Sequence, residues 1–451
     1  MTKYLTPVSL WPDPNALGPL TDLYQLTMMA AYHTAGRAGD RAVFEMFVRR
    51  MPVNRAYLVL AGLEQALADL LRLRFAPEQI AAIKRLPAFS TTDSSFFEGL
   101  YPLKFEGDVW AVAEGTIVFA GEPLLRVHAP LAQAQWVETF LLTSIGYPTL
   151  VASKAARIVE AAAGRPVYDF GLRRGQGGHA GMLAARASYL AGCAGTSNVD
   201  AAIRLGIPCT GTMAHSWVQS FDTEEEAFST FARIFPDNST LLVDTYDTAK
   251  GVARAAAIDP PINAIRIDSG DLLEEARKAR TILDQANRNQ VKIVGSGDLD
   301  ESSITALVEA GAPYDAFGVG TELITSRDAP ALGIVYKLVE LNGKGRIKLS
   351  PDKKTYPMGK QIYRQRDTAN RFVGDHVTQA DERAEGEPLL VPVVTGGRLT
   401  ASLPSLDMIR QRCRQQLSSL PDYLRGLDAK PEYPLTYSDL LEDEARRLGV
   451  K

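Results

Sequence analysis

The sequence predicts a mixed α/β protein whose central part forms a barrel-like parallel sheet. After residue 163, short apolar runs alternate regularly with segments of helical periodicity, which is the pattern of parallel βαβ units. The part before it mixes helical spacing with strand-like alternation, and from about Lys344 the regular rhythm stops. Successive βαβ units either wind doubly or close on themselves, and we favour a barrel-like closure.

These changes of pattern divide the chain into three parts. We expect an N-terminal α/β domain at residues 1–135, an α/β barrel at 136–343 and a C-terminal part at 344–451. Because the last part lacks the βαβ rhythm, we expect it to return to the first domain instead of extending the barrel.

The first part contains two predicted helices and several predicted strands. Apolar residues recur at helical spacing in 20–34 and 56–70, and the alternating segment 42–50 between them predicts a strand. From Pro102 to His128, short β-type runs are separated by glycine and proline. This pattern predicts a small antiparallel sheet.

The barrel part opens with a predicted helical stretch from Gln133 to Ala163. Helical segments such as EEARKARTILDQA and ESSITALVEA then separate short strands. The predicted strands are PVYDF, IPCTGT, TLLVDT, AIRID, VKIVGS, DAFGVG and GIVYKLV. The last part holds a Lys-rich stretch, LSPDKKTYPMGKQIYR, a polar loop, and two predicted amphipathic helices around MIRQRCRQQL and SDLLEDEARRL.

Composition excludes several classes of protein. The chain is 46% hydrophobic and 23% charged with a net charge of -4, so no basic face indicates a nucleic-acid or membrane partner. Cys193, Cys209 and Cys413 are too few and too scattered for a disulfide framework. There is no apolar h-region at the N-terminus and no run of eighteen apolar residues. We therefore expect a cytoplasmic protein with reduced thiols.

Polar segments follow six successive predicted strands. These segments are 169–178, 211–217, 244–248, 267–271, 295–300 and 318–323, and all are rich in Gly, Asp, Ser and Thr. One such segment is ordinary, because a βα turn needs glycine and a helix start favours a polar cap. Six that converge on one edge fit a ligand with several phosphates, since backbone N–H groups and helix N-termini bind oxygen anions and carboxylates hold Mg²⁺.

Other phosphate-binding signatures are absent from the sequence. No GxxxxGK[ST] motif occurs, and GSGDLD lacks the third glycine of the dinucleotide fingerprint. Neither a P-loop nor a Rossmann site is therefore indicated.

Several motifs together resemble one known family. They are TDLYQLTMMAAY, DFGLRRGQGG, GTSNVDAA, GTMAHSW, LLVDTYDT, IRIDSGDL, GVGTELITS, GKQIYRQRD and PSLDMIRQRCRQQL. Their order and spacing are similar to those of nicotinate phosphoribosyltransferases over nearly the whole chain. The segments GTMAHSW and TDLYQLTM are the most specific.

The resemblance implies a reaction, a fold and an assembly. Nicotinate and phosphoribosyl pyrophosphate (PRPP) would give nicotinate mononucleotide and pyrophosphate in NAD salvage, with Mg²⁺ and with ATP hydrolysis coupled through a phosphohistidine. The fold would be that of type II phosphoribosyltransferases, an irregular, TIM-like α/β barrel beside an α/β domain built from the N- and C-terminal parts. The protein would form a homodimer with active sites shared between subunits.

His215 is the candidate phosphohistidine. It is one of five histidines and follows a predicted strand end in a turn with Gly and Thr. Imidazole titrates near neutrality and is a good nucleophile toward phosphorus. Without the resemblance, a histidine that caps a helix is the competing interpretation.

Five residues are candidates for binding nicotinate. Arg266 would pair with the carboxylate, Thr212 would add a polar contact, and Ser197 would not repel the acid. Phe170 and Tyr24 of the partner subunit would sandwich the pyridine ring, as the resemblance implies. Taken singly, Phe170 is more often a core residue and Tyr24 more often a residue that anchors a helix face.

The PRPP-binding candidates come from four of the polar segments, 169–178, 267–271, 295–300 and 318–323. Arg173 matches the family's pyrophosphate-binding arginine. Asp268 and Asp271 would hold ribose hydroxyls or Mg²⁺ and, in catalysis, stabilise positive charge at the anomeric carbon, although Asp271 equally suits a helix cap. The remaining candidates are Ser269, Gly270, Gly297, Asp298, Gly318, Gly320 and Thr321. We assign Mg²⁺ to the phosphates and name no protein side chain as its established ligand.

Two other functions remain open at this point. A nicotinamide phosphoribosyltransferase would share the fold and the histidine, but that family carries an aspartate at the position of Ser197. A barrel that has lost its chemistry would act as a binding protein, which the joint presence of His215, Arg266 and Asp268 disfavours. The sequence also departs from the family pattern at Gly175 and His179 and at Gly146-Tyr147.

Overall fold

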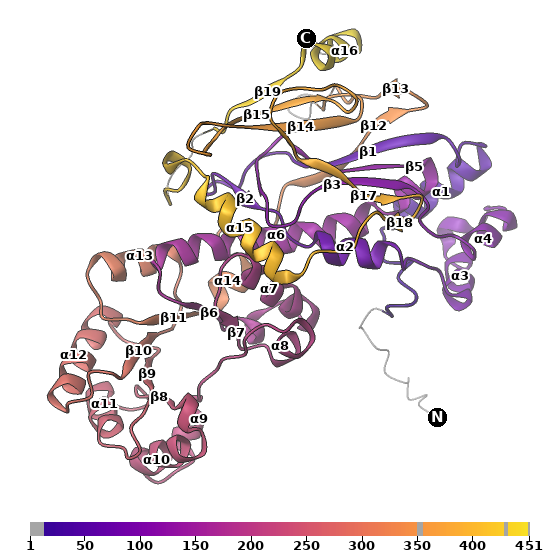
Figure 1. Ribbon diagram of the computed structural model, residues 1–451. Helices are drawn as coiled ribbons and strands as arrows, with labels where there is room; N and C mark the ends of the chain where they lie inside the picture. The colour runs from indigo at the N-terminus through magenta and orange to yellow at the C-terminus, as the bar shows by residue number, and fades with distance from the viewer. Residues whose placement is uncertain (1–12, 350–354, 428–431, 450–451) are drawn as a thin grey trace, which may run out of the picture.

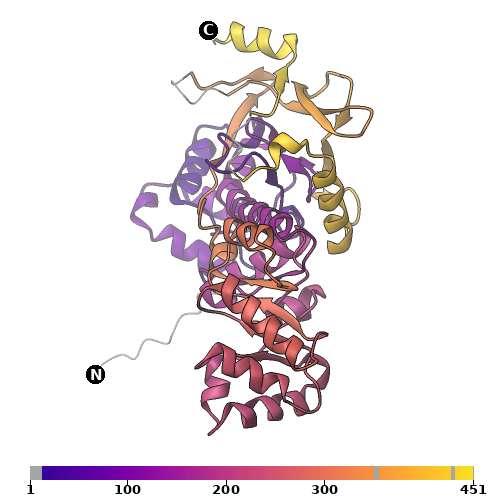
Figure 2. The same ribbon diagram turned by 90° about the vertical axis from the view of Figure 1, so that its left-hand side faces the viewer.

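The computed structural model describes residues 13–349, 355–427 and 432–449. Residues 1–12 of the predicted first domain and residues 350–354 of the Lys-rich stretch lie outside them. The chain forms an upper domain from its two ends and a lower domain from its middle (Figures 1 and 2). None of the described helices combines the length and apolarity needed to cross a membrane.

The upper domain is centred on a seven-stranded sheet to which distant parts of the chain contribute. In spatial order its strands are β13 (Lys344–Gly345), β12 (Ile334–Leu341), β1 (Arg41–Val48), β5 (Pro123–Pro130), β3 (Asp108–Val112), β17 (Leu390–Thr395) and β18 (Arg398–Leu399). All of these pairs are antiparallel. The predicted α/β domain built from both ends of the chain is therefore confirmed.

Two smaller sheets and seven helices complete the upper domain. The sheets are β2 (Leu58–Val59) with β4 (Ile117–Val118), and β16 (Glu387–Pro388), β14 (Lys360–Arg366), β15 (Phe372–Gln379) and β19 (Leu435–Tyr437) in that order. The helices are α1 (Leu23–Thr34), α2 (Leu63–Leu70), α3 (Pro77–Lys84), α4 (Ser94–Leu100), α5 (Leu131–Trp136), α15 (Leu406–Ser418) and α16 (Asp439–Arg447).

The lower domain is a curled, six-stranded parallel sheet surrounded by helices (Figure 1). Its order is β7 (Gly195–Thr196), β6 (Val167–Asp169), β11 (Ala316–Val319), β10 (Lys292–Gly295), β9 (Ala264–Ile267) and β8 (Thr240–Leu242). The helices are α7 (Gly178–Leu190), α8 (Val199–Leu205), α9 (His215–Gln219), α10 (Glu224–Ile234), α11 (Thr248–Ala256), α12 (Leu272–Gln285), α13 (Glu301–Glu309) and α14 (Thr321–Thr325). The predicted α/β class is confirmed as a half-barrel with β7 and β8 at its edges.

Two predicted barrel strands are wrong. GIVYKLV forms β12, which pairs antiparallel with β1, so the chain re-enters the upper sheet before Lys344. IPCTGT contributes only an isolated bridge from Cys209 to Thr196, and the short β7 takes the edge position instead. Both segments are apolar and short, and apolarity alone does not tell which sheet will bury a strand.

The C-terminal part contains strands that the sequence did not predict. The segment GKQIYRQRD lies largely in β14, and β15, β17 and β19 follow before and between the two predicted helices, which are α15 and α16. In β14 the polar side chains alternate with buried ones, including a fully buried arginine, Arg364. Arg364, paired with Asp375, occupies a buried position that is usually apolar, so the alternation of apolar and polar residues that predicts a strand is not visible in the sequence.

Helix α6 (Glu138–Ala161) joins the two domains. Its first half, with Phe140, Leu141 and Ile145, packs in the core of the upper sheet. Its second half, with Val151 and Ala155, packs in the core of the lower sheet. A single 24-residue helix therefore belongs to both cores and fixes one domain against the other.

Arg364 ties the C-terminal sheet to the rest of the upper domain. Its guanidinium pairs with Asp375 at 2.7 Å and donates to the carbonyl of Ile117 at 2.7 Å and to Gln416 Oε1 at 3.2 Å. Glu122 lies 3.7 Å from the same guanidinium. Burial, together with the nearby charge of Asp375, raises the pKa of Glu122 well above its usual value. One buried cation is therefore shared by one charged and one neutral carboxyl group.

We predict that Glu122→Gln folds with a loss of less than about 1 kcal/mol, because glutamine mimics the neutral carboxyl group. The folded protein binds a proton at Glu122 that the unfolded chain releases above its ordinary pKa. The stability of the wild type relative to Glu122→Gln should therefore fall as pH rises above about 4.3. Urea unfolding of both proteins between pH 4 and pH 8 measures this difference.

The matched variant is Arg364→Met, which leaves Asp375 buried without its cation. We expect it to lose about 3–5 kcal/mol. Two outcomes would contradict this assignment of charge. One is an equal loss of unfolding free energy in Glu122→Gln and Arg364→Met, and the other is a stability difference between the wild type and Glu122→Gln that does not change with pH.

Candidate active site

The carboxyl ends of the six parallel strands lie along one edge of the lower sheet. The register pairs Asp169 with Thr196 and with Val319, and it pairs Gly295 with Ile267. The polar segments that follow these strands are therefore neighbours in space, as the parallel arrangement requires. The segment 211–217 reaches the same edge after the bridge at Cys209.

Asp244 and Asp268 form the polar centre of this edge. Asp244 Oδ2 accepts hydrogen bonds from the backbone N–H of Asp268 at 3.0 Å and from the hydroxyl of Ser269 at 2.6 Å. The hydroxyl of Ser296 donates to Asp268 Oδ1 at 2.5 Å. The other oxygen of Asp244, Oδ1, is buried without a protein partner. A buried, unpaired carboxylate oxygen indicates a position for a cation or a hydroxyl group.

Asp244 and Ser296 were not among the predicted site residues. Both lie in segments that the sequence identifies as polar strand ends, 244–248 and 295–300. A polar residue one or two positions after the end of a strand, before the helix cap, is the signal that would have selected them.

Two glycines shape the backbone around Asp268. Gly270 has φ of +83° and Gly297 has φ of +96°, in the region that favours glycine. A Cβ atom at Gly297 would lie 2.0 Å from the carbonyl oxygen of Asp268. The turn after β10 therefore packs directly on the turn after β9.

Arg266 lies on β9 and points toward the segment that carries His215. Its Nη1 donates to the hydroxyl of Thr212 at 2.7 Å, and its buried Nε has no protein partner. Burial lowers the pKa of Arg266, and the charges of Asp268 and Asp244 oppose that shift. An arginine remains charged under these conditions, so an unpaired guanidinium nitrogen is available to an anion.

His215 is the first residue of α9 and is half-buried. Its Nδ1 lies 3.2 Å from the hydroxyl of Thr245, in the segment after β8. The N-cap of α9 is Ala214, and no side chain caps this helix. The structure thus places His215 against a neighbouring strand end, and the competing interpretation as a helix cap is wrong.

Asp169 joins the segments that carry Phe170 and Ser197. Its carboxylate accepts from the N–H of Gly171 and from the hydroxyl of Thr196, both at 2.8 Å, and its carbonyl accepts from the N–H of Ser197 at 2.9 Å. Burial raises the pKa of Asp169. The ends of β6 and β7 are therefore locked together.

The ring of Phe170 lies against Gly318. A Cβ atom at this glycine would lie 2.3 Å from the ring, so glycine is required for the ring position. Gly320 precedes α14, and Thr321 is its first residue. The segment after β11 thus supports the aromatic ring and starts a helix whose N-terminus faces the same edge.

Arg173 lies exposed on the 3-10 turn Leu172–Arg174, and its charge lowers the pKa of Arg266. His179 lies in the first turn of α7, and Gly177 before it has φ of +95°. The segment 175–179, where we expect a departure from the family pattern, therefore leads into α7 directly after Arg173 and Arg174.

Three predicted site residues make no hydrogen bond to this centre among the described residues. Tyr24 lies on α1 in the upper domain, where its hydroxyl accepts from Gln25 at 2.8 Å, and burial with the charge of Glu138 raises its pKa to about 12. Asp271 caps α12 by accepting from the N–H of Leu273 at 3.1 Å. Asp298 is exposed with φ of +48°.

The described residues contain no cluster of three or more His, Cys, Asp or Glu that would hold a metal by itself. The unpaired Asp244 Oδ1 and the adjacent Asp268 nevertheless fit a Mg²⁺ ion that takes most of its ligands from phosphates and water.

Family models match almost the whole chain. The model of the nicotinate phosphoribosyltransferase N-terminal domain matches residues 20–146, the family model matches residues 166–376, and the C-terminal domain model matches residues 383–444.

Individual relatives agree with these matches. The chain is 46% identical to the nicotinate phosphoribosyltransferase pncB2 of Mycobacterium tuberculosis, over 95% of this chain and 93% of the relative. It is 37% identical to the nicotinate phosphoribosyltransferase of Bacillus subtilis, over 95% and 94%. The crystal structure of human nicotinic acid phosphoribosyltransferase superposes with a TM-score of 0.84 at 30% identity, over 96% of this chain and all of that chain. The chain therefore belongs to the nicotinate phosphoribosyltransferase family.

Proposed function

We propose that this protein transfers the phosphoribosyl group of PRPP to the ring nitrogen of nicotinate and releases pyrophosphate. The observation that carries this proposal is the grouping of Arg266 with Thr212, Asp268 with Asp244, and His215 with Thr245 on neighbouring strand ends. One edge thereby offers a site for a carboxylate, a site for a sugar and a nucleophile for phosphorus. Family membership supports the same reaction.

The reaction makes modest demands on proton transfer. The pyridine nitrogen already carries a lone pair, so its attack on the anomeric carbon needs no general base. Catalysis then depends on aligning the ring with that carbon and on neutralising the departing pyrophosphate. Both tasks suit a rigid edge with fixed charges.

The nicotinate end of the site uses Arg266 and Phe170. The guanidinium is held by Thr212, and its unpaired Nε faces the same region, so it would bind the substrate carboxylate. The ring of Phe170, seated against Gly318, would stack on one face of the pyridine. Ser197, whose N–H donates to the carbonyl of Asp169, would complete the pocket without adding negative charge.

The PRPP end uses the turns after β9, β10 and β11. Asp268 and Ser269 would bind the ribose hydroxyls, and Asp268 would stabilise positive charge that develops at the anomeric carbon. The glycine turns at 295–298 and 318–320 and the N-terminus of α14 would receive phosphate oxygens, and Arg173 would bind pyrophosphate. When Mg²⁺ is bound, Asp244 and Asp268 would hold it beside the phosphates, where it neutralises their charge.

His215 is the proposed site of coupling to ATP. Its Nδ1 contacts Thr245, which leaves Nε2 to attack the γ-phosphorus of ATP. The new P–N bond forms as the bond to the bridging oxygen of ADP breaks, and water later cleaves the phosphohistidine to inorganic phosphate. The energy of ATP hydrolysis would thereby drive the synthesis forward.

We also propose a homodimer with shared sites. Tyr24 is 46% exposed near the start of α1, the preceding Leu20 and Leu23 are exposed as well, and α1 lies in the upper domain, away from the lower sheet of its own chain (Figure 1). An exposed aromatic group with apolar neighbours favours contact with another chain. Tyr24 of the partner subunit would then cover the other face of the nicotinate ring.

The first test is product analysis. Nicotinate, nicotinamide and quinolinate are each supplied with PRPP, with and without Mg-ATP, and mononucleotides are separated by chromatography. We expect nicotinate mononucleotide, formed faster or to a higher yield with Mg-ATP. Product from nicotinamide or quinolinate alone would refute the assigned substrate, and no product at all would favour a non-catalytic binding protein.

The second prediction concerns phosphorylation. After incubation with γ-labelled ATP, the wild type should carry an acid-labile label, and His215→Asn should carry none. His179→Asn is the matched control, because that histidine lies near the same edge but is exposed at the start of α7, so it should keep the label. Label that persists in His215→Asn would exclude this nucleophile.

The third prediction concerns nicotinate binding. Arg266→Gln should raise the KM for nicotinate by about 10- to 100-fold, because a charge-assisted hydrogen bond contributes about 1.5–3 kcal/mol. Thr212→Val should have a smaller effect in the same direction, since it removes only the hydroxyl that orients Arg266. Steady-state kinetics would contradict this role if Arg266→Gln changed the KM for PRPP and left that for nicotinate unaltered.

A further inference from the structure

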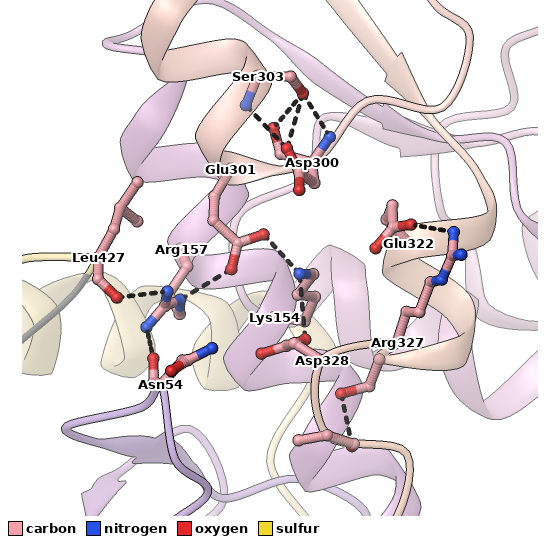
Figure 3. Close-up of polar contacts among 12 residues, drawn as sticks. Asn54, Lys154, Arg157, Asp300, Glu301, Ser303, Glu322, Arg327, Asp328 and Leu427 are labelled. Carbon is pink, nitrogen blue, oxygen red and sulfur yellow. Dashed lines mark hydrogen bonds and ion pairs between the residues drawn. The ribbon is translucent and has the colours of Figure 1, made fainter.

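Two buried cations on α6 face the lower sheet (Figure 3). Lys154 Nζ lies 2.5 Å from Glu301 Oε2 and 3.1 Å from Asp328 Oδ1, and its side chain is only 3% exposed. Arg157 Nε lies 3.0 Å from the other oxygen of Glu301, Oε1. The ammonium group of Lys154 therefore joins two carboxylates from separate segments of the lower domain.

The first of these carboxylates is attached to the turn after β10. Glu301 is the first residue of α13 and directly follows Asp300, the N-cap of that helix. Asp300 and Ser303 form a capping box, with the N–H of Ser303 donating to Asp300 Oδ1 at 2.8 Å. The turn that contains Gly297 ends at this cap, so a shift of Glu301 would move the turn.

The second carboxylate is attached to the turn after β11. Asp328 follows α14, whose five residues begin directly after Gly320. Arg55 holds this end as well, since its Nη2 lies 2.9 Å from Asp328 Oδ1 and 2.5 Å from the hydroxyl of Ser326. Burial by itself would raise the pKa of Asp328, but its bonds to Arg55 and Lys154 hold that pKa well below its usual range.

The turns after β10 and β11 and the short helix α14 do not fix their own positions. An isolated helix of five residues is unstable in water, so α14 depends on its tertiary contacts. A buried charge that loses its partner is strongly unfavourable, which makes the spacing of Glu301, Lys154 and Asp328 stiff. Because Lys154 lies on a helix anchored in both cores, it supplies one fixed point for two turns.

We propose that Lys154 is a positioning residue that holds the turns 295–300 and 318–320 at the spacing required by the phosphate groups of PRPP. This inference rests on the proposed function, because it assumes that both turns bind phosphates. Lys154 does not contact the substrate in this arrangement. Its main effect is on the affinity for the phosphorylated substrate and for pyrophosphate, and nicotinate, which reaches this turn only through the ring of Phe170 on Gly318, is affected less.

The test compares Lys154→Met with Lys360→Met. Lys360 is also a buried lysine, 2.7 Å from the buried Glu45, but it lies on β14 in the upper domain. The KM for each substrate is measured together with the binding of pyrophosphate by calorimetry. For Lys154→Met we expect the KM for PRPP and the Kd for pyrophosphate to rise about 10-fold or more, with the KM for nicotinate within about 2-fold of wild type. Lys360→Met should lower the stability and leave both constants unchanged.

Asp328→Asn is the second variant, because asparagine keeps the shape of the side chain and the side chain of Asp328 is 19% exposed. This substitution weakens the ion pairs at the end of α14 and leaves the pair of Lys154 with Glu301 in place. It should raise the KM for PRPP by less than Lys154→Met does. If Lys154→Met does not fold, the KM values of Asp328→Asn test the positioning role instead. Equal changes in the KM of both substrates, or a Lys360→Met variant with the same pattern as Lys154→Met, would overturn the inference. A wild type that binds pyrophosphate but forms no mononucleotide would refute the proposed function alone, since the binding comparison still tests Lys154.

Discussion

The structure depends on α6, because this helix is buried in both domains and carries charges that only the surrounding segments can neutralise. Lys154 and Arg157 are almost fully buried, and a buried cation without partners is strongly unfavourable. Their partners come from every part of the chain: Glu301 and Asp328 from the lower domain, the carbonyl of Asn54 from the upper domain and that of Leu427 from the C-terminal part. These ion pairs and hydrogen bonds fix the lower domain relative to α6 and the upper domain, whereas apolar packing alone would allow small displacements between them.

The same physical constraint acts at the edge of the lower sheet. Arg266, Asp244 and Asp268 are brought together by adjacent parallel strands, and their charges partly compensate one another. The compensation is incomplete, since Nε of Arg266 and Oδ1 of Asp244 are buried without protein partners. A ligand with both an anionic and a hydroxyl-rich part would complete both unsatisfied groups. Nicotinate and PRPP together have this chemistry.

Much of the fold was predictable because βαβ units repeat a simple pattern, and the location of the site followed from it. The order of the strands could not be read, because β7 has two residues and β12 resembles a barrel strand in composition. Within the polar strand ends, the sequence does not separate ligand-facing residues from helix caps. Asp247, Asp271 and Asp300 cap α11, α12 and α13 by accepting backbone hydrogen bonds.

Asp244 and Asp268 occupy the same kind of segment, yet the carboxylate of Asp244 accepts from the backbone N–H of Asp268 and the hydroxyl of Ser269, and that of Asp268 accepts from the hydroxyl of Ser296. In both segments the difference is position: the carboxylate that caps comes three residues after the one that faces the edge. Only the φ and ψ angles of the intervening turn, which include the positive φ of Gly270, decide this outcome. They depend on how the neighbouring turn at Gly297 packs, which is a tertiary contact.

The two segments where we expect the sequence to depart from the family pattern, at 146–147 and 175–179, are close in space. Gly146 and Tyr147 lie inside α6, and the hydroxyl of Tyr147 donates to the carbonyl of Ile324 at 2.8 Å, with the carbonyl of Ala180 at 3.4 Å. Burial raises the pKa of Tyr147, so the hydroxyl keeps the proton that it donates. Ala180 directly follows His179, and Ile324 lies in α14. One side chain on α6 therefore contacts both α14, the helix after the 318–320 turn, and the first turn of α7, so these two segments share a support on α6.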